Sequence, residues 1–171
     1  DLSHNSININ WNEIGSATVW DIEYGEAGFT QGTGTTVASS TNSTTVTGLI
    51  SYTVYDFYVQ ADCGNGDVSS WFGPFSFTTL CGSLPAPFSE GFSSTLPSCW
   101  SMSGGENWLF NTSGPNHVGN VGNLSGSTFS GGHYAVIDAS GYSGANGSAL
   151  LESPIIDVSS LTTAELTFYL I

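Results

Sequence analysis

Lysine and arginine are absent from this chain of 171 residues. An average chain would hold roughly 20 of them, because charged residues make up about a quarter of ordinary sequences and about half of those are basic. Fourteen carboxylates therefore face only three histidines, and the formal net charge is −14. Without guanidinium or ammonium groups to hold phosphates, we expect no nucleic-acid partner and no docking on an anionic membrane.

Long apolar runs and cysteine motifs are also missing. No run approaches the roughly 18 apolar residues that cross a bilayer, so we expect no direct membrane insertion. No basic segment of a signal peptide opens the chain, which fits either a removed signal or an interior piece of a longer protein. Three cysteines without a Cys-x-x-Cys motif do not indicate zinc. They fit one disulfide plus one further thiol, and a disulfide indicates an extracellular or cell-surface location.

The residues that are present indicate a folded, all-β chain. Hydrophobic residues make up 39% and aromatic residues 13% of the sequence, whereas disordered chains are poor in both. In the first half, apolar and polar residues alternate with a period of two, which is typical of half-buried strands. A polar stretch at 25–43 interrupts these runs, and in the second run Asp21 and Glu23 lie on the face opposite to the apolar side chains. The alternating runs, which together predict a β-sandwich, cover residues 6–11, 18–24, 44–47, 53–62 and 71–79.

Four features follow one another along residues 1–80: Trp11, Leu49 six residues before Tyr55, the strand Tyr-x-Phe-x-Val-x-Ala that begins at Tyr55, and the closing strand 70–79. With these features, residues 1–80 resemble a fibronectin type III domain. This resemblance implies that Tyr55 forms a tyrosine corner, with its hydroxyl returning to the backbone near Leu49. It also implies that the family's first strand lies before residue 1.

After a short boundary at 80–87, the chain contains the motifs Phe-x-Glu-Gly-Phe, Pro-x-Cys-Trp, Gly-His-Tyr-Ala-Val-Ile-Asp and Ala-Leu-Leu-Glu-Ser-Pro-Ile-Ile-Asp. With these motifs, residues 81–171 resemble the MAM and bacterial cleaved-adhesin group of jelly rolls. A jelly roll needs eight strands, and fewer can be counted here, so we expect an incomplete domain. The final run, 166–171, has the pattern of a core strand. The pairing of the two domain types implies a large secreted bacterial surface protein.

This second resemblance also implies a disulfide and a metal site. Similar sequences often pair the cysteines that correspond to Cys81 and Cys99, and such a bond would stabilise the fold by roughly 3 kcal/mol in the chain-entropy model. Jelly rolls of this type often bind calcium, which nominates Glu90 and Asp138 as ligands, together with the region of Asn107. In a chain without basic side chains, a buried carboxylate otherwise needs hydrogen bonds or protonation.

Two further clusters have alternative interpretations. The acidic run Asp62-x-x-Asn65-x-Asp67 lacks the length and the terminal Glu of an EF-hand loop, so we interpret it as a turn whose side chains cap backbone amides. Cys63 and Cys81 lie at opposite ends of adjacent predicted strands and should not pair. Cys63 is then either a buried free thiol or has a partner in sequence outside this chain.

Catalytic and sugar-binding side chains give only weak signals. The histidines, His4, His117 and His133, stand near no nucleophile elbow, so we expect no enzyme. Trp71, Trp100 and Trp108 could stack on sugar rings, but together with Trp11 and Trp20 they are expected to fill the sandwich cores.

The leading functional hypothesis is a non-catalytic extracellular adhesion or spacer segment. Its partners would be a surface glycan or protein, or further modules of the same protein. One alternative is an accessory binding region of a secreted hydrolase, and another is a filament subunit completed by strands from its neighbours. The absence of Lys and Arg has two possible explanations. One is a self-repelling, trypsin-resistant surface with calcium as counter-charge, and the other is a segment that was delimited between basic residues.

Overall fold

The computed structural model describes residues 1–105, 108–112, 133–137 and 148–168. These residues form strands, turns and loops, and none of them lies in a helix, so no described segment is a helix that could cross a membrane. The prediction of an all-β chain with sandwich-like sheets is confirmed. Close contacts within the chain divide it into two compact units, Asp1–Gly82 and Ser83–Ile171.

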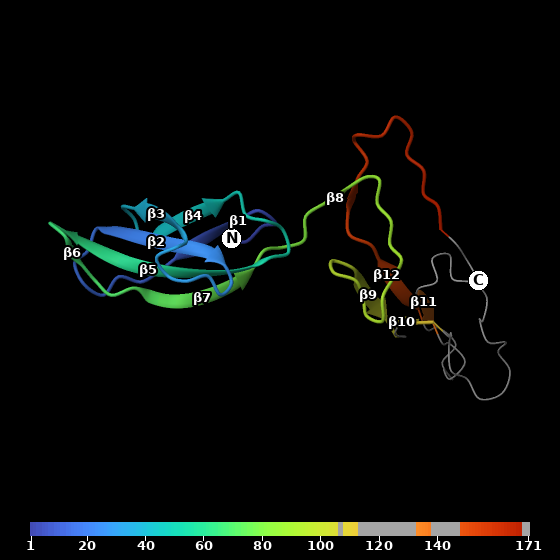
Figure 1. The fold of residues 1–171 in the computed structure, drawn as a ribbon, viewed down its shortest axis with the longest axis horizontal. Helices are drawn as coiled ribbons and strands as arrows, with labels where there is room; N and C mark the ends of the chain where they lie inside the picture. The colour runs from blue at the N-terminus through green and yellow to red at the C-terminus, as the bar shows by residue number, and fades with distance from the viewer. Residues whose placement is uncertain (106–107, 113–132, 138–147, 169–171) are drawn as a thin grey trace. The chain divides into compact units, whose positions relative to one another are not determined.

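The first unit is a two-layer sandwich (Figure 1). One sheet pairs β1 with β4, and in the other β2 pairs with β3 and β5, while β5 also pairs with β6 and β7; all these pairs are antiparallel. Its strands are β1 (Ser6–Asn10), β2 (Val19–Glu26), β3 (Thr35–Ser39), β4 (Ser43–Thr47), β5 (Val54–Gly64), β6 (Asp67–Val68) and β7 (Phe72–Thr78).

Strand β3 lies inside the stretch that the sequence predicted to be a polar connection. It pairs with β2 over five residues, from Thr35 opposite Tyr24 to Ser39 opposite Trp20. It is the end strand of its sheet, and only Val37 among its side chains is a large apolar group. Because the main chain rather than apolar side chains holds an edge strand of this kind, hydrophobic alternation did not reveal it.

Alternate residues of both sheets fill the space between the layers. Strands bury every second side chain on one face, and each large aliphatic or aromatic group removed from water contributes roughly 1.5–3 kcal/mol. The seven buried apolar residues of this core are Ile9, Trp20, Ile22, Val46, Leu49, Tyr55 and Val59.

The tyrosine corner that the resemblance implied is present. The Tyr55 hydroxyl accepts a hydrogen bond from the N–H of Ile50 at 3.0 Å, one residue beyond the position of Leu49. The buried Thr79 hydroxyl donates to the carbonyl of Ile50 at 2.7 Å and accepts the N–H of Thr53 at 2.9 Å. The loop before β5 is therefore held by one side chain from β5 and by one from the residue that follows β7.

The second unit contains short strands in three two-stranded sheets among its described residues. β9 pairs with β12 and β10 pairs with β11, both antiparallel, whereas β8 pairs with β13 in parallel. The expectation of a jelly roll is neither confirmed nor contradicted by these sheets. The strands are β8 (Leu84–Pro85), β9 (Ser101–Gly104), β10 (Trp108–Asn111), β11 (Tyr134–Ile137), β12 (Ala149–Glu152) and β13 (Ile156–Asp157).

The expectation of a core strand at 166–171 is wrong for the residues described there. Residues 166–168 lie in no strand, and the side chains of Leu166 and Phe168 are 85% and 68% exposed. A strand requires a neighbour to take its N–H and C=O groups, and no described residue pairs with this segment. Residues 169–171 lie outside the described residues.

Candidate functional site

Cys81 and Cys99 are joined by a disulfide, as the jelly-roll resemblance implied. Cys99 is half-buried, and its backbone has a φ of 66°, in the left-handed region. The bond closes the intervening chain into a loop. Such a closure restricts the unfolded chain, which is the basis of its stabilising effect.

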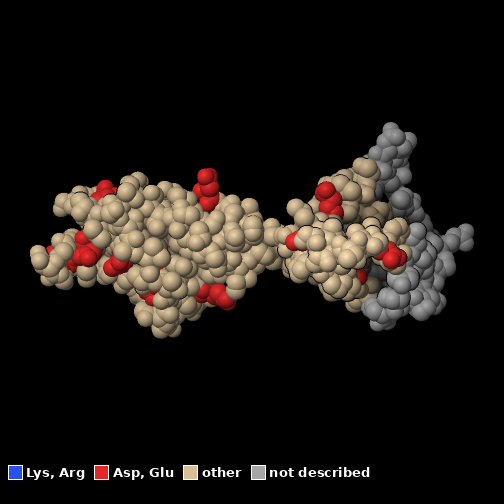
Figure 2. Space-filling view, turned by 90° about the horizontal axis from the view of Figure 1, so that it is seen from above, with Lys and Arg blue, Asp and Glu red and all other residues tan. Residues whose placement is uncertain are grey.

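Of the two predicted calcium ligands, one can be placed. The Oε1 atom of Glu90 accepts the N–H of Phe92 at 2.6 Å, in a turn where Phe92 has a φ of 52°. Asp138 and Asn107 lie outside the described residues. Across the described ranges, His, Cys, Asp and Glu side chains do not gather in a group of three or more that could hold a metal. On the face drawn in Figure 2, carboxylates stand apart from one another on a surface without basic groups. Calcium binding therefore stays a prediction.

The acidic run at the β5–β6 turn is a capped turn, as predicted. The Oδ1 atom of Asp62 accepts the N–H of Gly64 at 2.8 Å, and Asn65 adopts a φ of 54°. The Asp62 carboxylate thus accepts a hydrogen bond from a backbone amide of its own turn.

Glu23 is the most distinctive polar residue of the first unit, and sequence reasoning did not single it out. Its side chain is 1% exposed, although it lies on the face of β2 opposite to the core, as the alternation predicted. One carboxylate oxygen, Oε1, accepts the N–H groups of Gly32 and Gly34, both at 2.7 Å. The other oxygen, Oε2, is buried and makes no hydrogen bond. No Lys or Arg exists to pair with it, so backbone donors carry the stabilisation of this carboxylate.

The loop between β2 and β3 covers Glu23. Phe29 in this loop makes an edge-to-face contact with Tyr58 of β5, with 5.7 Å between the ring centroids. The N–H of Gly28 donates to Oδ2 of Asp56 at 2.8 Å, and the Ser76 hydroxyl donates to Oδ1. These two hydrogen bonds, that from Ser76 first, lower the pKa of Asp56 below its usual value of 3.8. Two carboxylates on one outer sheet face therefore anchor one loop.

A Cβ atom at Gly34 would lie 2.7 Å from the carbonyl oxygen of Tyr24 and 2.6 Å from the ring of Phe29. Only glycine fits there, and its N–H can therefore approach the Glu23 carboxylate. A run of glycines after a strand with a central Glu is the one sequence signal of this anchor. It is weak, because glycines also occur in other turns of this chain, such as Gly64 and Gly66 at the β5–β6 turn.

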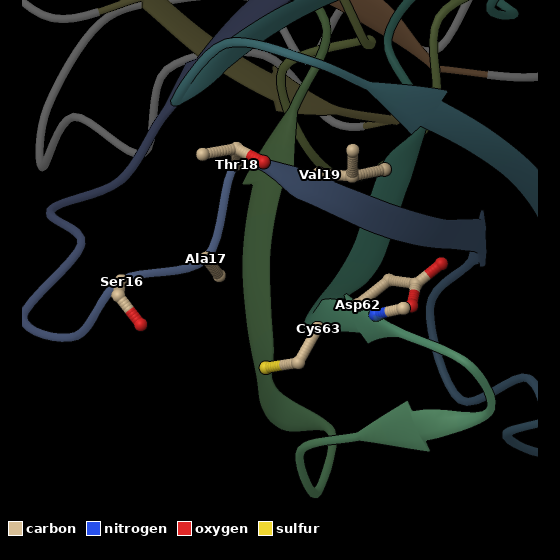
Figure 3. A pocket seen from close by; sticks show the side chains of 7 residues that line it. Ser16, Ala17, Thr18, Val19, Asp62 and Cys63 are labelled. Carbon is tan, nitrogen blue, oxygen red and sulfur yellow. The ribbon is translucent and has the colours of Figure 1, made fainter.

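Cys63 carries an exposed free thiol. It does not pair with Cys81, as predicted, but the expectation of a buried thiol is wrong. Pairing of β5 with β2 ends at Asp62, opposite Val19, and the register of β5 against β6 shifts between Asp62 and Gly64. Cys63 thus lies in the end of β5 that β2 no longer pairs with. Beside it is a hollow of about 230 Å³ (Figure 3), lined by Ser16, Ala17, Thr18, Val19, Asp62, Cys63 and Gly64.

The tryptophans divide into two groups. Trp20 is buried and makes an edge-to-face contact with Trp11 at 5.7 Å between centroids, so the prediction that both belong to the core is confirmed. Trp71, Trp100 and Trp108 are half-buried rather than fully enclosed. Of the histidines, His117 lies outside the described residues.

The first unit has the two sheets, the filled interior and the tyrosine corner of one widespread extracellular module. The family model of the fibronectin type III domain matches residues 1–76. This match supports a fibronectin type III domain in the first unit. No curated protein matches the chain. Fibronectin type III domains are usually extracellular, are commonly non-catalytic adhesion or spacer modules, and mediate protein interactions. The MAM-like jelly roll remains a prediction.

Proposed function

We propose that this chain is a non-catalytic extracellular adhesion or spacer segment of a larger secreted or cell-surface protein. The observation that carries the proposal is the fibronectin type III domain at residues 1–76, with its closed core and its tyrosine corner. A module of this kind supplies a rigid unit with exposed loops and edges for contacts.

Two further observations support this role. The disulfide between Cys81 and Cys99 suits an oxidising compartment. The net charge of −14 without any Lys or Arg gives a self-repelling surface, which keeps neighbouring modules soluble and apart. In this proposal the partners are a surface glycan or protein, or further modules of the same protein.

A binding screen with product analysis tests the proposal. The purified chain is immobilised and exposed to a glycan array and to a panel of extracellular proteins, and every bound ligand is examined by mass spectrometry. Retention of intact ligand assigns the adhesion role, and no retention on any surface assigns the spacer role. Cleavage of a retained glycan or peptide by the chain contradicts the proposal.

We also propose that calcium binds at Glu90 and Asp138 in the second unit. The support is the oxygen chemistry that calcium prefers and the absence of any basic side chain that could neutralise these carboxylates. Thermal melts with calcium and with a chelator test it, with Glu26→Gln, a change in the other unit, as the matched control. We expect chelation to lower the melting temperature of the chain and of the control, but not that of Glu90→Gln. An unchanged melting temperature in the parent chain contradicts calcium binding.

A further inference from the structure

Strand β3 ends its sheet with one side that no described residue of the chain covers. It pairs with β2 on its other side, and β3 and β7 lie at opposite margins of this sheet (Figure 1). The first residues of the chain run beside β1, which belongs to the other sheet, and the N–H of Asn8 donates there to the carbonyl of Asp1. The open side of β3 therefore does not depend on where the chain begins.

The pairing of β2 shows which main-chain groups of β3 face this open side. Just beyond β2, the N–H of Ala27 donates to a carbonyl of β5 at 2.9 Å, so residue 27 faces β5. The main-chain groups of successive residues in a strand point to alternate sides. Those of Tyr24 therefore face β3, and those of its partner Thr35 face back to β2. The N–H and C=O groups of Thr36 and Ala38 are left facing the open side, and both residues are exposed.

This edge has none of the features that usually prevent sheet edges from pairing with another chain. Exposed edges are normally blunted by charged side chains, by proline or by a bulge. Strand β7 has two of these features, since it contains Pro74 and its register against β5 shifts between Phe57 and Val59. Strand β3 contains no charged residue and no proline, and it pairs with β2 over five residues without a shift. Its main chain can therefore accept another strand.

An unpartnered carboxylate lies one strand inward from the open edge. Asp21 of β2 is directly opposite Ala38, on the sheet face away from the core, and is half-buried. No described residue donates a hydrogen bond to it, and its neighbour Gln60 donates instead to the carbonyl of Ser69 at 2.6 Å. Only the methyl group of Ala38 separates this carboxylate from the edge.

A long basic side chain on an added strand can cross that methyl group. Neighbouring strands are about 4.8 Å apart, so the backbone of a strand added to β3 would lie about 10 Å from that of β2. The side chains of Lys or Arg and of Asp21 together span this separation. Such a pair would join a partner's ammonium or guanidinium group to a carboxylate that has no counter-charge in its own chain.

We propose that an extended segment of another polypeptide, with a Lys or Arg opposite Ala38, adds to β3 as an antiparallel strand. Its main chain would exchange hydrogen bonds with Thr36 and Ala38, and its basic side chain would pair with Asp21. In strand addition of this kind, the main chain supplies affinity and the alternate side chains supply specificity. The inference names a partner for the adhesion role proposed above and rests on that role.

Charge distinguishes this partner from a second copy of the chain. The 171 residues include no Lys or Arg, so no segment of the same copy or of a second one can supply the basic side chain. Two copies with a net charge of −14 each also repel one another, whereas a basic segment is attracted. Net charge, rather than the residues of β3, thus disfavours pairing between copies.

A synthetic strand tests the proposal on the intact chain. The probe is the fluorescent nonapeptide Thr-Val-Thr-Val-Lys-Val-Thr-Val-Thr, and its binding is measured by fluorescence anisotropy at low and at physiological salt. We expect saturable binding that weakens with salt, because screening reduces the attraction between opposite charges. In amide exchange, the bound probe should protect the N–H groups of Thr36 and Ala38.

Two methylated probes separate strand addition from simple attraction between opposite charges. A methyl group on the amide nitrogen of the central Lys removes a donor that faces β3 and should abolish binding. The same group on the next Val removes a donor that faces away from β3, so the affinity should change little. In a third probe, replacing Lys by Thr should weaken binding about fivefold, the upper range for an ion pair near the surface.

Two pairs of variants locate the contact on the chain. Ala38→Lys places a basic group beside Asp21 and should weaken binding at least about fivefold. Thr47→Lys makes an equal change in charge at an exposed position of β4, in the other sheet, and should have little effect at physiological salt. Asp21→Asn should also weaken binding about fivefold, whereas Asp67→Asn, at an exposed position of β6, should not. Far-UV circular dichroism verifies that the variants are folded.

Four results would overturn the proposal. They are no saturable binding, equal effects of the two methylated probes, and equal effects within either pair of variants. The fourth is protection of Thr36 and Ala38 that rises with the concentration of the chain alone, which would make a second copy the occupant. Failure of the probe would not decide the adhesion role, because retention of intact ligand in the glycan and protein screen tests that role separately.

Discussion

The hydroxyl of Tyr55 accepts the N–H of Ile50 at 3.0 Å, so one side chain of β5 fixes the loop that precedes its own strand. Tyr55 is only 6% exposed, and its ring stacks on Phe77. The same side chain therefore both fills the core and satisfies a backbone donor at its margin.

Replacing Tyr55 by Phe should lower the free energy of unfolding by about 1–3 kcal/mol. The ring and its packing remain, but the N–H of Ile50 loses its acceptor in a half-buried site, and an unsatisfied donor costs that much. Equilibrium urea denaturation of the chain measures the loss. Tyr52→Phe, which removes a hydroxyl from a side chain that is 52% exposed, is the control and should change stability little. Equal effects of the two changes would contradict a structural role for the corner hydroxyl.

Replacing Glu23 by Ala should destabilise the first unit by about 3 kcal/mol. The change removes two charge-assisted hydrogen bonds and leaves the N–H groups of Gly32 and Gly34 without their acceptor. Amide hydrogen exchange should show faster exchange at both glycines. The control is Glu26→Ala, at an exposed position of the same strand. It removes the same charge as Glu23→Ala and should leave the exchange at the two glycines unaltered. Unchanged protection at Gly32 and Gly34 would show that the loop does not depend on Glu23.

Period-two alternation predicted five strands of the first unit well, because the side chains that alternate are those that the sandwich buries. The buried face of a strand can be recognised from the spacing of its own apolar residues, such as Ile7 and Ile9 in β1 or Tyr55 and Val59 in β5. Strand β3 escaped prediction because its pairing is a main-chain interaction with β2.

The site features depended on contacts between distant residues, which alternation does not encode. Glu23 has the sequence pattern of an outward-facing carboxylate, and its burial arises from a loop that folds back over the sheet. The exposure of Cys63 follows from the residue at which β2 stops pairing with β5. None of these can be read from one strand alone.

Acid should weaken the anchor of the β2–β3 loop through Asp56. Hydrogen bonds from Ser76 and Gly28 hold the folded-state pKa of Asp56 below 3.8. A depressed carboxyl pKa contributes stability at pH values above its unfolded-state pKa, and this contribution is lost as the pH falls through the folded-state pKa. The free energy of unfolding of Asp56→Asn, followed from pH 6 to pH 2, should therefore fall less steeply below about pH 4 than that of the parent chain. A pH profile parallel to that of the parent would contradict this linkage.

Reduction of the disulfide should lower stability by roughly 3 kcal/mol in the chain-entropy model, since the loop between Cys81 and Cys99 is no longer closed in the unfolded chain. Thermal melts with and without a reductant measure the shift. Cys63→Ser should retain the full sensitivity to reductant, whereas Cys81→Ser with Cys99→Ser should lose it. A reductant effect that survives in the double variant would assign the shift to another cause.

Cys63 should react with thiol reagents in the folded chain, because its side chain is exposed and borders an open hollow. The rate should depend on the charge of the reagent. Asp62 lines the same hollow and the chain has a net charge of −14, so an anionic aromatic disulfide should react more slowly than a neutral maleimide. The difference in rate should shrink as salt screens the carboxylates. Cys63→Ser should abolish labelling by both reagents. Labelling that requires denaturant would mean that the thiol is covered, and a rate ratio independent of salt would mean that the acidic surface does not act on this site.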